Sequence, residues 1–92
     1  MRPENLGRQV LIQKSYAARE ACLLKNAAAE NTSMVDAATL AHSVALACSA
    51  ETEALITASN FDGDKQVANN VRQDTQFRAL KYVFRARGQS IF

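Results

Sequence analysis

The sequence predicts an all-α fold: a long antiparallel helical hairpin followed by a shorter, broken third helical segment, forming a three- to four-helix bundle. Aliphatic residues recur at helical rather than alternating spacing. Helix breakers are scarce, with three Gly and one Pro in 92 residues, and no stretch reads as a strand. Since 92 residues are the size of one domain, we expect residues 1–92 to fold as a single helical unit.

The first helix is expected over about residues 4–30. Pro3 suits the first turn of a helix, and Asn31 can take the left-handed position that ends one. On a helical wheel, one side is apolar and the opposite side is polar. The stripe expected in the core is Leu6, Val10, Ala17, Ala21, Leu24 and Ala28, and the stripe expected in water is Arg8, Ser15, Arg19 and Asn26.

The second helix is expected over about residues 33–60. Ser33 can cap its start, with Asp36 three residues further on. Its apolar residues cover a broad arc, which predicts neighbours on two sides. Because the link to the first helix is only two or three residues long, the two helices must run antiparallel.

The third segment is expected over about residues 64–87. Gly63 can form a left-handed turn, and Asp64 or Asp62 can cap the helix that follows. The apolar face shifts by about a quarter turn between the start and the end of this segment. The shift predicts a break or a change of packing partner, with Asp74 or Thr75 capping a new helix.

Charge is unevenly distributed along the chain. Residues 31–63 carry four acids and no Lys or Arg, whereas residues 64–92 carry six Lys or Arg and two acids. In the basic end, Phe77, Leu80 and Phe84 share one helical spacing, and Arg78, Lys81 and Arg85 share another. The expectation is that the aromatic residues dock in the core. The cations then face outward, either as an ordinary solvated face, which the notion of a two-faced helix favours, or as a surface for a polyanion or an acidic partner. These cations are Arg78, Lys81, Arg85 and Arg87.

The two cysteines, Cys22 and Cys48, lie inside separate predicted helices. The hairpin register places them about 10 Å out of step, beyond the reach of a disulfide, so reduced thiols are expected. The N-terminus lacks the apolar run of a signal peptide. Residues 37–50 are too polar and too short to cross a bilayer. These observations predict a soluble, cytoplasmic protein that does not bind membranes.

No catalytic or metal-binding residues are predicted, and no cofactor. The single histidine, His42, has no neighbouring carboxylate pair or nucleophile signature. Together with the cysteines it offers too few convergent ligands for zinc. The stretch from Asn60 to Gln66 is not a calcium loop either, because Lys65 stands where that loop requires Gly.

The sequence therefore predicts a non-catalytic interaction protein: an adaptor, an inhibitor or regulator of a larger protein, or a subunit of a helical assembly. The expected partner is a protein or a second copy, since more apolar surface remains than the helices can cover. The residues expected at that interface are Ile12, Tyr16, Leu23, Val35 and Leu46. The alternative is a nucleic-acid-binding protein that uses the basic C-terminal helix.

Overall fold

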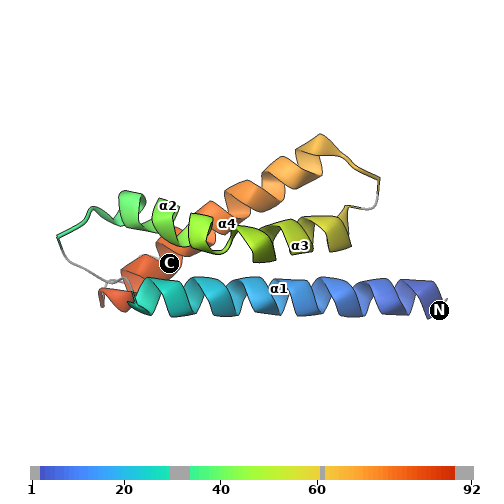
Figure 1. Cartoon of the computed structure of the whole chain (residues 1–92), viewed down its shortest axis with the longest axis horizontal. Helices are drawn as coiled ribbons and strands as arrows, with labels where there is room; N and C mark the ends of the chain where they lie inside the picture. Colours follow the sequence, from blue (N-terminus) through green and yellow to red (C-terminus); the bar gives the residue numbers. More distant parts are fainter. Residues whose placement is uncertain (1–2, 30–33, 61, 89–92) are drawn as a thin grey trace.

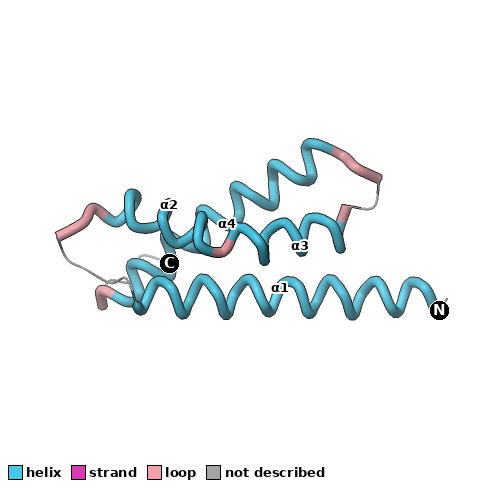
Figure 2. The backbone as a smooth tube through the Cα atoms, in the orientation of Figure 1, coloured by secondary structure: helices cyan, strands magenta, loops and turns pink. Residues whose placement is uncertain are grey.

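The computed structural model describes residues 3–29, 34–60 and 62–88, with side chains described from Gly7 onward. Over these ranges the chain forms four helices and no strand. Figure 2 colours the helical and loop segments along the backbone. The helices are α1 (Pro3–Ala29), α2 (Ala37–Ala47), α3 (Ser49–Ser59) and α4 (Lys65–Ala86). The predicted all-α fold is confirmed.

The helices form an elongated bundle with extents of 50 × 22 × 22 Å. In Figure 1, α1 runs along one side of the molecule, α2 and α3 return antiparallel to it, and α4 crosses obliquely. Most contacts of α2 are with α4, and most contacts of α3 are with α1. The outer side of α1 faces none of the other three helices (Figure 1).

The caps of two predicted helices can be compared with the structure. Asp64 caps α4, because its carboxylate accepts a hydrogen bond from the Gln66 N–H at 2.8 Å, and Gly63 has the expected positive φ of 73°. The second helix begins later than predicted, with Asp36 as its cap. The predicted roles of Asn31 and Ser33 fall outside the described residues.

The chain breaks in a different helix from the one predicted. The expected continuous helix over 33–60 is divided at Cys48 into α2 and α3. At this residue φ is −106° and ψ is 21°, which turns the chain between the two axes. The break allows α2 to pack on α4 while α3 packs on α1. The segment predicted as one helix therefore contacts two different helices.

The break predicted in the third segment is absent, because α4 is continuous from Lys65 to Ala86. Asp74 and Thr75, expected to start a new helix, lie in its interior. The helix accommodates the shift of its apolar face by changing neighbours along its length, since it contacts α1, α2 and α3. Ala79 and Val83 are buried in the core of the bundle.

Within the described residues, none of the helices combines the length and the apolar character that a bilayer span requires.

Candidate interaction surface

Helix α1 is turned by about half a revolution from the orientation that its sequence suggests. Arg19, predicted to face water, is fully buried, and Asn26 on the same side is partly buried. On the other side, Val10 and Leu24, predicted to be in the core, are 46% and 54% exposed. The stripe predicted to be in water therefore faces the bundle, beside the buried Leu23 and Ala27, and the stripe predicted for the core faces out.

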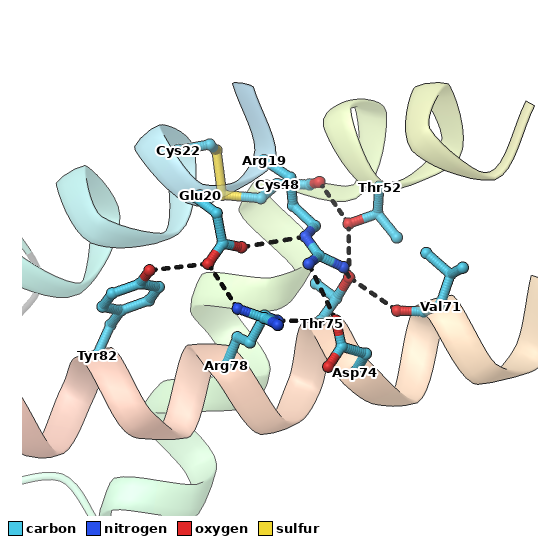
Figure 3. Close-up of polar contacts among 10 residues, drawn as sticks. All are labelled: Arg19, Glu20, Cys22, Cys48, Thr52, Val71, Asp74, Thr75, Arg78 and Tyr82. Atoms are coloured by element: carbon cyan, nitrogen blue, oxygen red, sulfur yellow. Dashed lines mark hydrogen bonds and ion pairs between the residues drawn. A yellow bond between two sulfur atoms is a disulfide. The ribbon is translucent and has the colours of Figure 1, made fainter. Parts of the chain in front are cut away.

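The buried guanidinium of Arg19 belongs to a cluster of four charges between α1 and α4, drawn in Figure 3. Arg19 pairs with Glu20 at 3.2 Å and with Asp74 at 3.0 Å. Arg78 pairs with the same two acids, at 3.0 Å and 2.8 Å. Each carboxylate is thus shared by two guanidinium groups. The four formal charges cancel, which offsets part of the cost of burying them.

Neutral side chains complete the Arg19 cluster. Arg19 donates a further hydrogen bond to the Thr75 hydroxyl at 3.2 Å, and the Tyr82 hydroxyl donates to Glu20 at 2.8 Å (Figure 3). The Thr52 hydroxyl lies 3.2 Å from that of Thr75, which joins α3 to the same network. The ring of Tyr16 lies 5.0 Å from the Arg19 guanidinium and 5.1 Å from that of Arg78.

The pKa values of two residues reflect this environment. Burial and the hydrogen bond to Glu20 raise the pKa of Tyr82. Burial lowers the pKa of Arg78, but the interactions with Asp74 and Glu20 outweigh it, so the net shift is upward. Both groups keep their protons more firmly than in water. With three of its nitrogens bonded inside the protein, Arg19 is arranged to join helices rather than to hold a ligand.

A disulfide joins Cys22 of α1 to Cys48 at the break between α2 and α3 (Figure 3). The prediction that these residues are free thiols too far apart to bond is wrong. The helices are separated by more than the two or three residues assumed, since α1 ends at Ala29 and α2 begins at Ala37, and the chain turns at Cys48. The register of an unbroken hairpin therefore does not apply, and the two Cα atoms lie 5.9 Å apart. The Asn26 amide donates to the Cys22 carbonyl oxygen at 2.9 Å beside the bond.

The five residues predicted at a partner interface do not form one surface. Leu23 is fully buried in the core, so its assignment to an interface is wrong, and Val35 is partly buried against the same core. Ile12 and Tyr16 line a groove of about 330 Å³ between α1, α3 and α4. Leu46 is 60% exposed and lines a different groove between α2, α3 and α4.

The four cations predicted as a polyanion surface also differ in their surroundings. Arg78 belongs to the Arg19 cluster, and Arg87 donates a hydrogen bond to the Val35 carbonyl oxygen. Lys81 and Arg85 lie 5.7 Å and 5.8 Å from the ring of Tyr82. Two of the four charges are therefore engaged with other parts of the protein.

The aromatic residues of α4 differ from the prediction as well. Phe77, expected to anchor the core, is 52% exposed, and Phe84 is only partly buried. Leu80 packs against the edge of the core. The fully buried positions of this stretch are Ala79 and Val83, because the helix is rotated to bring Thr75 and Arg78 against α1 and α3.

The groove that Leu46 lines has a volume of about 350 Å³ and lies between the α2–α3 break and α4. His42 lines it, together with Glu53 and Arg72, which form an exposed ion pair at 3.0 Å. Among the described residues, no three His, Cys, Asp or Glu side chains gather as metal ligands would.

A largely apolar surface covers the outward side of α1, here called the outer face. All of its residues are exposed: Val10, Leu11, Lys14, Ala17, Ala18, Ala21, Leu24, Lys25 and Ala28. Beside it runs a groove of about 720 Å³ between α1 and α3, lined by Leu11, Ala54 and Ala58 among others. Only the two lysines of the outer face carry charge.

The fold and the Arg19 cluster define an all-α helical bundle whose first helix buries Arg19 and leaves a largely apolar stripe exposed. Comparisons with protein-family models, with curated proteins and with solved structures find no match to this chain.

Proposed function

We propose that this protein is a non-catalytic interaction protein whose outer face binds a protein partner. The observation that carries the proposal is the reversed orientation of α1. A helix that is apolar on the side facing water normally buries that side against something else. Such a surface fits an adaptor, a regulator or inhibitor of a larger protein, or a subunit of a helical assembly.

The composition of the outer face supports a helical partner. Scattered exposed apolar residues are common on proteins, and Leu46 and Phe77 are examples here, but Val10, Leu11 and Leu24 share one side of one helix. Val10, Leu11 and Leu24 provide large side chains near its ends, and Ala17 and Ala21 between them are small. Small residues allow another helix backbone to approach closely, while the larger ones provide apolar area to bury.

A nucleic-acid partner receives less support. One observation favours it, because Phe77 is exposed and shares helical spacing with Lys81 and Arg85, so it could stack on a base. Two observations oppose it: Arg78 is neutralised within the Arg19 cluster, and Arg87 bonds to Val35. Of the four cations predicted to bind a polyanion, this leaves Lys81 and Arg85. Two cations are far fewer than the six to ten phosphate contacts of a strongly salt-dependent binder.

We also propose that the protein works with its disulfide formed. Disulfides persist in oxidising compartments and are rare where thiol reductants are abundant. The expectation of a cytoplasmic location rested partly on free cysteines and has lost that support. Mass spectrometry after thiol alkylation, without reduction, of protein taken from its source cell would show whether Cys22 and Cys48 remain unmodified.

Leu24→Glu should abolish partner binding while leaving the fold intact, because this side chain is in water in the free protein. The measurement is capture of partner proteins from the source cell, with far-ultraviolet circular dichroism as the check on folding. Leu46→Glu is the matched control, since Leu46 has similar exposure on another helix. Equal capture by both variants would remove the outer face as the binding surface.

A further inference from the structure

We propose that the partner of the outer face is a second copy of this chain, bound with the two α1 helices antiparallel. This inference rests on the proposed function and names the partner of the same surface. It follows from the spacing of the exposed residues, from the position of one lysine and from the exposed area of the chain.

The exposed residues repeat at the spacing that two packed helices require. Val10, Ala17 and Leu24 are seven residues apart, and Lys14, Ala21 and Ala28 repeat at the same interval, offset by four. These are the two core positions of a heptad. The pattern extends over most of α1, on the side that no other described helix covers (Figure 1).

The position of Lys14 favours an antiparallel pair. In a parallel pair equivalent residues face each other, so two Lys14 ammonium groups would meet in the seam at a cost in repulsion. In an antiparallel pair centred between Ala17 and Ala21, Lys14 lies against Leu24 of the other copy. Its aliphatic stem can then pack on Leu24 while the ammonium group reaches water. At the centre, Ala17 meets Ala21, where close approach is easiest.

The exposed area of the chain is adequate for such an interface. A compact monomer of 10.0 kDa exposes about 5,200 Å², whereas this chain exposes 5988 Å². The excess is of the same order as the roughly 800 Å² that each partner buries in a standard interface. The elongated shape of the bundle, 50 × 22 × 22 Å, accounts for this excess, and the exposed outer face contributes to it.

Sedimentation equilibrium of the purified protein at micromolar concentrations tests self-association directly. We expect the wild type to have twice the 10.0 kDa chain mass. Leu24→Glu should weaken the dimer about 100-fold, because two half-exposed leucines lose their burial in each dimer. Leu46→Glu should leave the dissociation constant unchanged within about a factor of three, as expected of a surface change far from the seam.

Cross-linking tests the antiparallel arrangement. Ala17→Cys and Ala21→Cys chains, mixed and mildly oxidised, should form the mixed disulfide dimer in preference to either like pair, because Ala17 faces Ala21 of the other copy. Predominant linking of Ala17→Cys to itself would show a parallel pair and overturn the arrangement. The native Cys22–Cys48 bond is checked in each product by peptide mapping.

The results separate this inference from the proposed function. A wild type that stays monomeric at all concentrations tested overturns the second copy as partner. If Leu24→Glu then still abolishes capture of a different protein, only the identity of the partner is wrong. If the wild type is a dimer that Leu24→Glu does not weaken, the outer face is not the dimer interface and this inference fails, while the proposed function is decided by the capture experiment.

Discussion

Arg19→Ala should destabilise the protein by about 2–4 kcal/mol, because it removes a fully buried side chain and its charged hydrogen bonds. The whole free energy of unfolding of a domain this size is about 5–14 kcal/mol, so the variant should lose a large share of its stability. The reason is the burial of Arg19 between α1 and α4. Without it, Glu20 and Asp74 share one guanidinium and Thr75 loses a donor.

Arg72→Ala provides the matched control for the urea-unfolding measurement. Arg72 pairs with Glu53 at 3.0 Å, but both side chains are about half exposed. Exposed pairs contribute roughly 0–1 kcal/mol, so this variant should remain nearly as stable as the wild type. If the two variants lost similar amounts of stability, Arg19 would not occupy the buried position described for it.

Removing the disulfide should cost about 3.5 kcal/mol in the free energy of unfolding. The bond closes a loop with a sequence separation of 26 residues. The chain-entropy model gives about 3.5 kcal/mol for a loop of this length, because the bond restricts the unfolded chain. The measurement is urea unfolding of the double variant Cys22→Ala with Cys48→Ala, compared with the wild type.

Chemical reduction of the wild type controls for the changed side chains. It should shift the urea midpoint downward by a similar amount, since it breaks the same covalent link and leaves both sulfur atoms in place. A midpoint that does not respond to reductant would mean that the bond does not stabilise the fold.

Some features that depend on local sequence were predicted correctly, although the new helix expected at Asp74 or Thr75 was not. The helical spacing of apolar residues indicated an all-α fold, and Gly63 and Asp64 marked the start of α4 because turn and cap chemistry is local. The break at Cys48 could not be found in this way. It contains neither Gly nor Pro, and it depends on the different neighbours that α2 and α3 contact.

The orientation of α1 could not be found from hydrophobicity, because the helix is apolar on two sides. A wheel favours the stripe through Val10 and Leu24, yet Leu23 on the other side is the residue in the core. What decides the orientation is the pairing of Arg19 with Asp74, 55 residues away. The only sequence signal was the pair of Asp74 and Arg78, spaced four residues apart to share a helix face opposite such a charge.

Two adjacent leucines test the orientation of α1 most directly, through the free energies of unfolding of Leu23→Glu and Leu24→Glu in urea. The unfolding is measured at a protein concentration below that at which the protein self-associates. Leu23 is fully buried, so a carboxylate there should cost more than about 4 kcal/mol and abolish cooperative unfolding. Leu24 is exposed, so the same change should cost less than about 1 kcal/mol. A stable Leu23→Glu beside an unfolded Leu24→Glu would place the apolar stripe in the core and contradict the reversed orientation of α1.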